Sequence, residues 1–121
     1  MPKPLKQIQK DVEDFCVERD WGNDDPNQLI SSILIELGEL SEYYQWQNKF
    51  KKLSKKKKKE IAYEFVDVIF YLARLANKSD IDLEEAFYDK LPKLAKKFPV
   101  GKDLKKAHIE YRSNGKNKLY N

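Results

Sequence analysis

The stretch of sequence that decides the fold is residues 61–76, IAYEFVDVIFYLARLA. At the helical rotation of roughly 100° per residue, this stretch is apolar on nearly all sides. Its one polar stripe consists of Glu64, Asp67, Tyr71 and Arg74. The pattern predicts a long helix that is buried on most sides and carries two carboxylates on its polar stripe.

A second acidic pair, Glu36 and Glu39, lies beside an apolar arc in residues 34–42, LIELGELSE. Counted from Ile33 and from Ile61, the two acidic pairs fall at the same helical angles. Two such helices packed together would therefore direct four carboxylates into one site. Buried carboxylates repel one another and lose hydration, which is costly unless a cation neutralises them. We therefore expect a site for a divalent cation.

The composition indicates one all-helical domain. The chain has 121 residues with only four glycines and five prolines, and long segments contain neither. The net charge of +4 is modest and does not by itself indicate nucleic acid. The single cysteine, Cys16, excludes an internal disulfide and suits a reducing compartment. No segment resembles a secretory signal or approaches the roughly 20 apolar residues of a membrane span, so we expect a soluble, cytoplasmic protein.

Helical spacing, caps and breakers together predict a bundle of four helices. Their expected extents are Pro4 to Arg19, Pro26 or Asn27 to Trp46, a start at the cap Ser54 continuing to Asn77, and a start near Asp82 with a stop at residues 99–101. Pro92 is expected to kink or end the fourth helix, and Gly38 to mark close packing or a ligand.

We expect the domain to occupy residues 1–112, with a short helix at 103–111, and residues 113–121 to form a polar, flexible tail. In a monomer, one apolar side of the third helix would remain exposed to solvent. We therefore expect subunits to associate and complete the bundle.

The available ligands narrow the chemistry. Carboxylates without histidine favour Mg²⁺, with Mn²⁺ as a substitute, and His108 lies far from both acidic pairs. The lysine runs at 49–59 and 90–106 are either solvated surface or an electrostatic collar that attracts polyanions. Trp21 and Trp46 bracket the acidic second helix, either as packing residues or as walls for a nucleobase. Mg²⁺ beside lysines suits chemistry at phosphate.

Several motifs together carry a family resemblance. They are LIELGELSE at 34–42, QW at 45–46 and EIAYEFVDVIFYL at 60–72, within a match that extends from FCVERDW at 15–21 to KFP at 97–99. This sequence resembles the MazG-like all-α nucleotide pyrophosphohydrolases, and especially their dCTP-pyrophosphatase-like branch. Either acidic pair alone would be weak evidence, whereas the full set of motifs makes a specific match.

The resemblance implies hydrolysis of a nucleoside triphosphate to the monophosphate and pyrophosphate by water that Mg²⁺ activates. By position, Glu36, Glu39, Glu64 and Asp67 would hold the metal. Glu36 and Glu39 are the implied catalytic residues, with Glu39 favoured as general base. The further positions that look like substrate contacts are Trp21, Trp46, Lys90 and Lys97. The resemblance also implies a homodimer, or a homotetramer built as a dimer of dimers.

One position departs from the family pattern. Leu94 stands where the dCTP-type branch commonly has an asparagine, so an amide that could contact base or sugar is missing. We favour deoxynucleotides such as dCTP or dATP, in a house-cleaning role. Two alternatives remain open: a nucleic-acid-binding module whose lysine runs contact the polyanion, and a nucleotide-binding protein that does not cleave its ligand.

Overall fold

The computed structural model describes residues 3–101, and the described part is helical without any strand. It forms two units, Met1–Leu83 and Glu84–Asn121. The helices are α1 (Leu5–Glu18), α2 (Pro26–Glu42), α3 (Lys55–Lys78) and α4 (Leu83–Lys97). The predicted all-α class is confirmed. His108, the short helix expected at 103–111 and the tail expected at 113–121 lie outside the described residues.

Two helix ends differ from the sequence-based expectation. α2 ends at Glu42 rather than at Trp46. The chain turns there because Gln47 Nε2 donates to the carbonyl oxygen of Tyr43 at 2.9 Å, and because Trp46 has a φ of 65°, which cannot continue a right-handed helix. α4 continues through Pro92 to Lys97, so an end at this proline was the wrong expectation.

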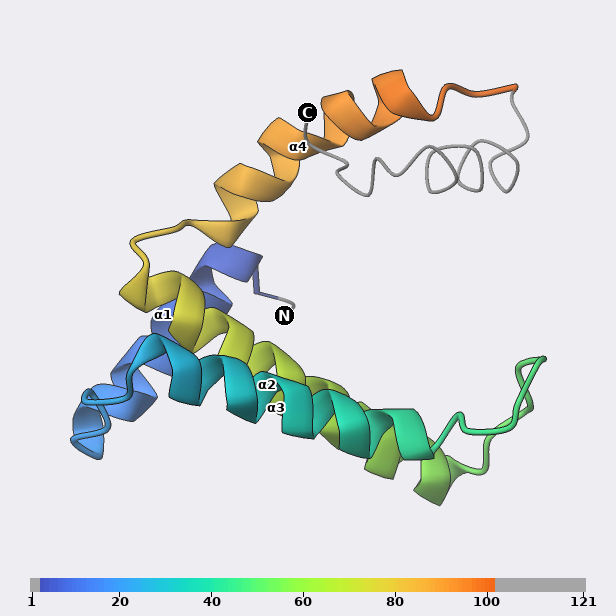
Figure 1. Cartoon of the computed structure of the whole chain (residues 1–121), viewed down its shortest axis with the longest axis horizontal. Coiled ribbons are helices and arrows are strands. Elements are labelled where there is room, and N and C mark those ends of the chain that lie inside the picture. Colours follow the sequence, from blue (N-terminus) through green and yellow to red (C-terminus); the bar gives the residue numbers. More distant parts are fainter. Residues whose placement is uncertain (1–2, 102–121) are drawn as a thin grey trace. The chain divides into compact units, whose positions relative to one another are not determined.

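In the first unit, α2 and α3 lie side by side and run antiparallel, and α1 packs against α3 (Figure 1). The buried apolar residues come from all three helices: Val12, Cys16, Leu29, Ile33, Ile61, Val68, Ala73 and Ala76. Phe70 is partly buried and packs against the cluster of Val12, Cys16 and Ala73. Because α3 contacts both other helices, it is the central element of this unit. This position explains why its sequence is apolar nearly all round.

The ends of α1 and α3 share one backbone motif. Asp20 and Asp80 each have a φ of 56°, in the left-handed region. The amide of Trp21 donates to the carbonyl oxygen of Cys16, and the amide of Ile81 donates to that of Ala76, both at 2.9 Å. This is the Schellman pattern, which satisfies carbonyl groups that a helix end would otherwise leave without partners. Both turns are therefore fixed by the backbone.

The starts of α2 and α3 are capped by side chains. Asp25 accepts from the amide of Gln28 at 2.8 Å, and the Gln28 side chain accepts from the amide of Asp25 at 3.0 Å. Ser54 Oγ accepts from the amide of Lys57 at 3.1 Å, which confirms the predicted cap. A cap of this kind contributes about 1 kcal/mol to helix stability.

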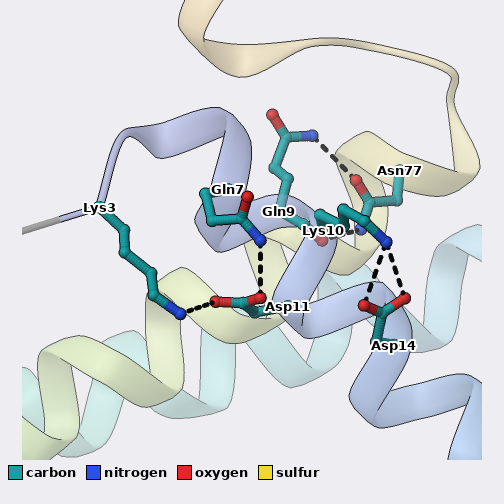
Figure 2. Close-up of polar contacts among 7 residues, drawn as sticks. All are labelled: Lys3, Gln7, Gln9, Lys10, Asp11, Asp14 and Asn77. Carbon is teal, nitrogen blue, oxygen red and sulfur yellow. Dashed lines mark hydrogen bonds and ion pairs between the residues drawn. The ribbon is translucent and has the colours of Figure 1, made fainter.

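A partly buried amide pair joins α1 to the end of α3. Gln9 Nε2 donates to Asn77 Oδ1 at 2.9 Å, and Asn77 Nδ2 donates back to the carbonyl oxygen of Gln9 at 3.0 Å (Figure 2). Gln9 Oε1 also accepts from the amide of Leu83 at 2.7 Å. The pair therefore fixes the turn that follows α3 against α1.

Much of the apolar surface of α2 and α3 stays exposed in the single chain. The clearest cases are Leu34 at 62%, Ile35 at 61% and Val66 at 56% exposure. Gly38 lies on α2 with nothing within 4 Å of the position where a Cβ would stand. Close packing within the chain therefore does not explain this glycine, and the alternative, a nearby ligand, stays a prediction.

Replacing Gly38 with alanine tests how open this position is. We expect Gly38→Ala to raise the free energy of unfolding by about 0.5–1 kcal/mol, because alanine is the better helix former and meets open space. Urea unfolding monitored by circular dichroism would measure the change. The reverse substitution at an exposed position of α3, Ala62→Gly, is the control and should lower stability by a similar amount. A loss of stability in Gly38→Ala would show that this position is occupied.

Candidate metal and nucleotide site

Three carboxylates from two helices meet near the middle of the α2–α3 pair. One oxygen each from Glu36 on α2 and from Glu64 and Asp67 on α3 lie within 4.8 Å of one another. Glu64 and Asp67 are three residues apart, so they share one face of α3. Ile33 and Ile61, at 6% and 3% exposure, are buried beside these acids and help to set the alignment of the two helices.

Glu39, the fourth predicted ligand, lies beside this group rather than within it. It is exposed, whereas Glu36 and Glu64 are partly buried. Its charge is close enough to raise the pKa of both Glu36 and Glu64. The structure therefore brings all four acids into one neighbourhood, with three of them close enough to share an ion and Glu39 at the exposed edge.

The electrostatics of this cluster are unfavourable without a cation. Burial raises the pKa of Glu64, and the charges of Glu39 and Asp67 raise it further. Burial and the neighbouring carboxylates act on the pKa of Glu36 in the same direction. The Oε2 atoms of Glu36 and Glu64 are buried and accept no hydrogen bond within the described residues. Unpaired buried carboxylate oxygens fit a hard divalent cation, which takes oxygen ligands.

The two tryptophans lie at opposite ends of α2. This helix has 17 residues and so spans about 25 Å, with Trp21 before its start and Trp46 after its end. Trp21 is 48% exposed and Trp46 is 94% exposed. A single chain therefore does not bring the two predicted base-pocket residues to one pocket.

Each end of α2 has its own hollow. At the Trp21 end, a pocket of about 480 Å³ is lined by Trp21, Gln28, Tyr71 and Arg74 among others. At the other end, a more apolar pocket of about 560 Å³ is lined mainly by side chains of α2 and the following loop, together with Phe65. The first pocket shares the polar stripe of α3 with Asp67, since Tyr71 follows Asp67 by one helical turn.

The remaining predicted substrate contacts, Lys90 and Lys97, lie on α4 in the second unit. Burial lowers the pKa of Lys90, and the nearby charges of Lys97 and Lys93 lower it further. Their contact with substrate stays a prediction. The lysine run at 55–59 is exposed throughout, with Lys57 paired to Glu60 at 3.4 Å.

Sequence reasoning missed one interaction at the site. Arg74 is only 7% exposed, and its guanidinium group pairs with Asp24 and donates to the carbonyl oxygen of Trp21. The signal was an arginine within an otherwise apolar helix. Its partner lies 50 residues earlier in the chain, so local spacing could not identify it.

Two antiparallel helices bring carboxylates together with no histidine among them, which defines the class as an all-α protein whose acidic group suits a hard cation. A family model described as dUTPase matches residues 3–116. The chain therefore belongs to this family, which is that of the MazG-like all-α nucleotide pyrophosphohydrolases.

Curated relatives carry related names. Over 105 residues the chain is 30% identical to dCTP pyrophosphatase 1 of Mus musculus and to that of Homo sapiens. Each alignment covers 82% of this chain and 62% of the relative. The chain thus spans about three-fifths of the length of these relatives. It is also 35% identical over 86 residues to the protein YpjD of Bacillus subtilis, covering 69% of this chain and 77% of that protein.

A solved structure agrees with the fold. The crystal structure of Bacillus subtilis YpjD, described as a candidate pyrophosphatase, superposes with a TM-score of 0.60 at 31% identity. The match covers 84% of this chain and 98% of YpjD. Within residues 3–101, none of the helices has the length and apolar character needed to cross a membrane.

The strained carboxylates predict a link between metal and stability. The pKa of Glu64 is raised above its ordinary value of 4.5, so the metal-free folded state loses stability as the pH rises above that value. At pH 7.5 without metal we expect Glu64→Gln to melt at a higher temperature than the wild type. Mg²⁺ should stabilise the wild type, by about 2.7 kcal/mol at 100 times its Kd, and should have little effect on the variant.

Differential scanning fluorimetry with EDTA and with Mg²⁺ would measure these shifts. Glu60→Gln is the matched control, because Glu60 is paired with Lys57 rather than with another acid. This control should keep the full response to Mg²⁺. An equal Mg²⁺ response in Glu64→Gln and in the wild type would contradict a cation at this cluster.

Proposed function

We propose that this protein is a Mg²⁺-dependent nucleoside triphosphate pyrophosphohydrolase that converts a (d)NTP to the (d)NMP and pyrophosphate. The observation that carries the proposal is the meeting of Glu36, Glu64 and Asp67 within 4.8 Å, with buried oxygens that accept no hydrogen bond within residues 3–101. Family membership and the names of the relatives support the same reaction. Mn²⁺ is expected to substitute for Mg²⁺.

The proposed roles divide the four acids. Glu36, Glu64 and Asp67 hold the metal, with Glu39 completing the ligand set or accepting a proton at its edge. A bound Mg²⁺ supplies positive charge that offsets the phosphates and lowers the pKa of water. The water oxygen bonds to the α-phosphorus, the bond from the α-phosphorus to its bridging oxygen breaks, and pyrophosphate leaves. Glu39 is the proposed base, because it is exposed beside the group.

The base specificity belongs to the same proposal. The matched family model is described as dUTPase, whereas the curated relatives are named dCTP pyrophosphatase 1. Leu94 lies on α4 where the dCTP-type branch commonly has an asparagine. We favour deoxynucleotides, dCTP or dATP first, in a house-cleaning role. The setting we propose is cytoplasmic, in keeping with the free, buried thiol of Cys16.

A binding module without hydrolysis is the competing function. In that case the four acids would form ion pairs with the lysine runs of another subunit. Nucleic-acid binding does not require carboxylates gathered at one place, and their negative charge beside the phosphates would oppose it. The arrangement therefore favours hydrolysis.

Pyrophosphate release from a panel of nucleoside triphosphates tests the reaction. With Mg²⁺ we expect release of pyrophosphate and monophosphate, and we expect Glu39→Gln to lower kcat by about 10²–10⁴-fold, the range for a lost general base. The same panel would rank the bases. Glu60→Gln, which removes a carboxylate that is paired with Lys57, is the control and should keep most of the activity. A folded wild type that hydrolyses no triphosphate would rule out the proposal.

We also propose that the active form is a homodimer or a dimer of dimers. The exposed apolar residues of α2 and α3 give an association surface: Leu34, Ile35, Leu37, Phe65, Val66, Ile69 and Leu72, each at least 43% exposed. Monomers rarely expose apolar patches of this kind. Association would also allow Trp21 of one chain and Trp46 of another to share a pocket, which one chain does not achieve.

A charge placed on this surface should prevent association. We expect Val66→Lys to shift the protein from an oligomer to a monomer in light scattering coupled to size exclusion, because a lysine buried in an interface loses its hydration. Lys58→Ala, on the exposed lysine run of the same helix, should leave the mass unchanged. A wild type that is monomeric at micromolar concentration would contradict the proposed assembly.

A further inference from the structure

Arg74 connects the acidic helix to the loop that carries Trp21. Its side chain is 8% exposed, and Nη2 both pairs with the carboxylate of Asp24 and donates to the carbonyl oxygen of Trp21 at 3.3 Å. Asp24 is 37% exposed, so one end of the ion pair reaches solvent. A buried guanidinium group is costly unless such partners satisfy it. Because burying Arg74 in an apolar helix does not by itself favour stability, we looked to the loop that it binds for the role of this side chain.

The loop at residues 21–25 has no regular secondary structure, yet three bonds hold its first residues. The amide of Trp21 donates to Cys16 at the end of α1. Arg74 holds the carbonyl oxygen of Trp21, and Lys78, one turn further along α3, donates to the carbonyl oxygen of Gly22. The backbone on both sides of the Trp21 side chain is thus fixed, partly by α1 and partly by α3.

The ring of Trp21 combines support with access. It meets Phe15 edge to face, with ring centroids 5.7 Å apart, and Phe15 meets Phe70 of α3 at 5.6 Å. Nearly half of Trp21 remains exposed, and it lines the pocket that also contains Tyr71 and Arg74. An aromatic ring that is braced on one edge and open elsewhere suits stacking against a planar ligand.

The polar stripe of α3 runs from the carboxylates to this loop. Asp67, Tyr71 and Arg74 follow one another at spacings of four and three residues, so they share one face of the helix. The same rigid helix therefore carries two of the acids and the cation that holds the Trp21 loop. A displacement of the loop would change the position of Trp21 relative to the acids.

We propose that the Arg74–Asp24 ion pair is a positioning device that fixes Trp21 as the wall against which the nucleobase of the substrate binds. The inference rests on the proposed function, since it takes a nucleoside triphosphate as the ligand. Arg74 touches neither the phosphates nor the metal in this scheme. Its loss affects binding of the base while the chemistry at the carboxylates continues.

The variant Asp24→Asn removes the ion pair at its partly exposed end and keeps the size of the side chain. We expect the KM for the preferred triphosphate to rise by roughly ten- to a hundredfold, the range for a misplaced binding group, with kcat within about threefold of the wild type. Arg74→Lys keeps the charge but cannot hold both partners, and should give a smaller rise in KM. Asp82→Asn is the matched control, because Asp82 pairs with Lys6 away from Trp21, and its kinetics should not change.

A second measurement, the quenching of Trp21 fluorescence, reports the order of this side chain without any enzymatic turnover. In a Trp46→Phe background, Trp21 is the remaining tryptophan of the chain. We expect Asp24→Asn to raise the acrylamide quenching constant of Trp21 by about twofold, because the loop loses local order. Asp82→Asn in the same background should leave it unchanged. Circular dichroism confirms that each variant is folded.

Unchanged quenching in Asp24→Asn would overturn the positioning role. A fall in kcat with an unaltered KM would overturn it as well, because it would place the ion pair in the chemical step. If the wild type hydrolyses no triphosphate, the proposed function fails, and the quenching comparison still decides whether the ion pair holds Trp21. The two failures are therefore distinguishable.

Discussion

Repulsion between like charges held at the junction of two helices is the constraint on which the rest of this structure depends. Carboxylates of Glu36, Glu64 and Asp67 share a space less than 5 Å across, and none of them has a cationic partner among the described residues. Such a cluster lowers stability by itself, so other parts of the fold must hold the helices together. The side-chain caps at Asp25 and Ser54, together with the buried isoleucines of α2 and α3, provide this support.

The single chain provides this support with few fully buried side chains. Among its large apolar residues, Leu29 alone falls to 2% exposure within the described part, while many others on α2 and α3 face outward. Exposed apolar side chains on α2 and α3, together with the partly buried carboxylates of Glu36 and Glu64, depart from the usual arrangement. This departure is understandable where the apolar surface meets other subunits and the carboxylates meet a ligand.

Local patterns in the sequence predicted most of the fold, because helix period, caps and breakers are themselves local. Ser54 and Pro26 marked true helix starts, and the matching angles of the acidic pairs placed the acids in one neighbourhood. The predicted end of α2 lies beyond the observed one because Tyr43 and Tyr44 continue the apolar spacing. The helix ends earlier because Gln47 donates a hydrogen bond to the carbonyl oxygen of Tyr43 and because Trp46 has a left-handed backbone.

Such local patterns could not predict contacts between distant parts of the chain. The pairing of Arg74 with Asp24 depends on how α3 crosses the end of α1, and no short spacing encodes it. The same holds for Glu39, whose place at the edge of the acidic group depends on the rotation of α2 against α3. Sequence could name the acids, but their individual environments required the packed helices.

The register of the antiparallel helices α2 and α3 also determines the distances between the three carboxylates. A slip of one helix along the other by a single turn would move a side chain by about 5.4 Å, more than the 4.8 Å that spans the acidic group. An ion that binds all three carboxylates therefore recognises one alignment of the two helices and no neighbouring one. Metal binding in such an arrangement would select the helix register as well as neutralise charge.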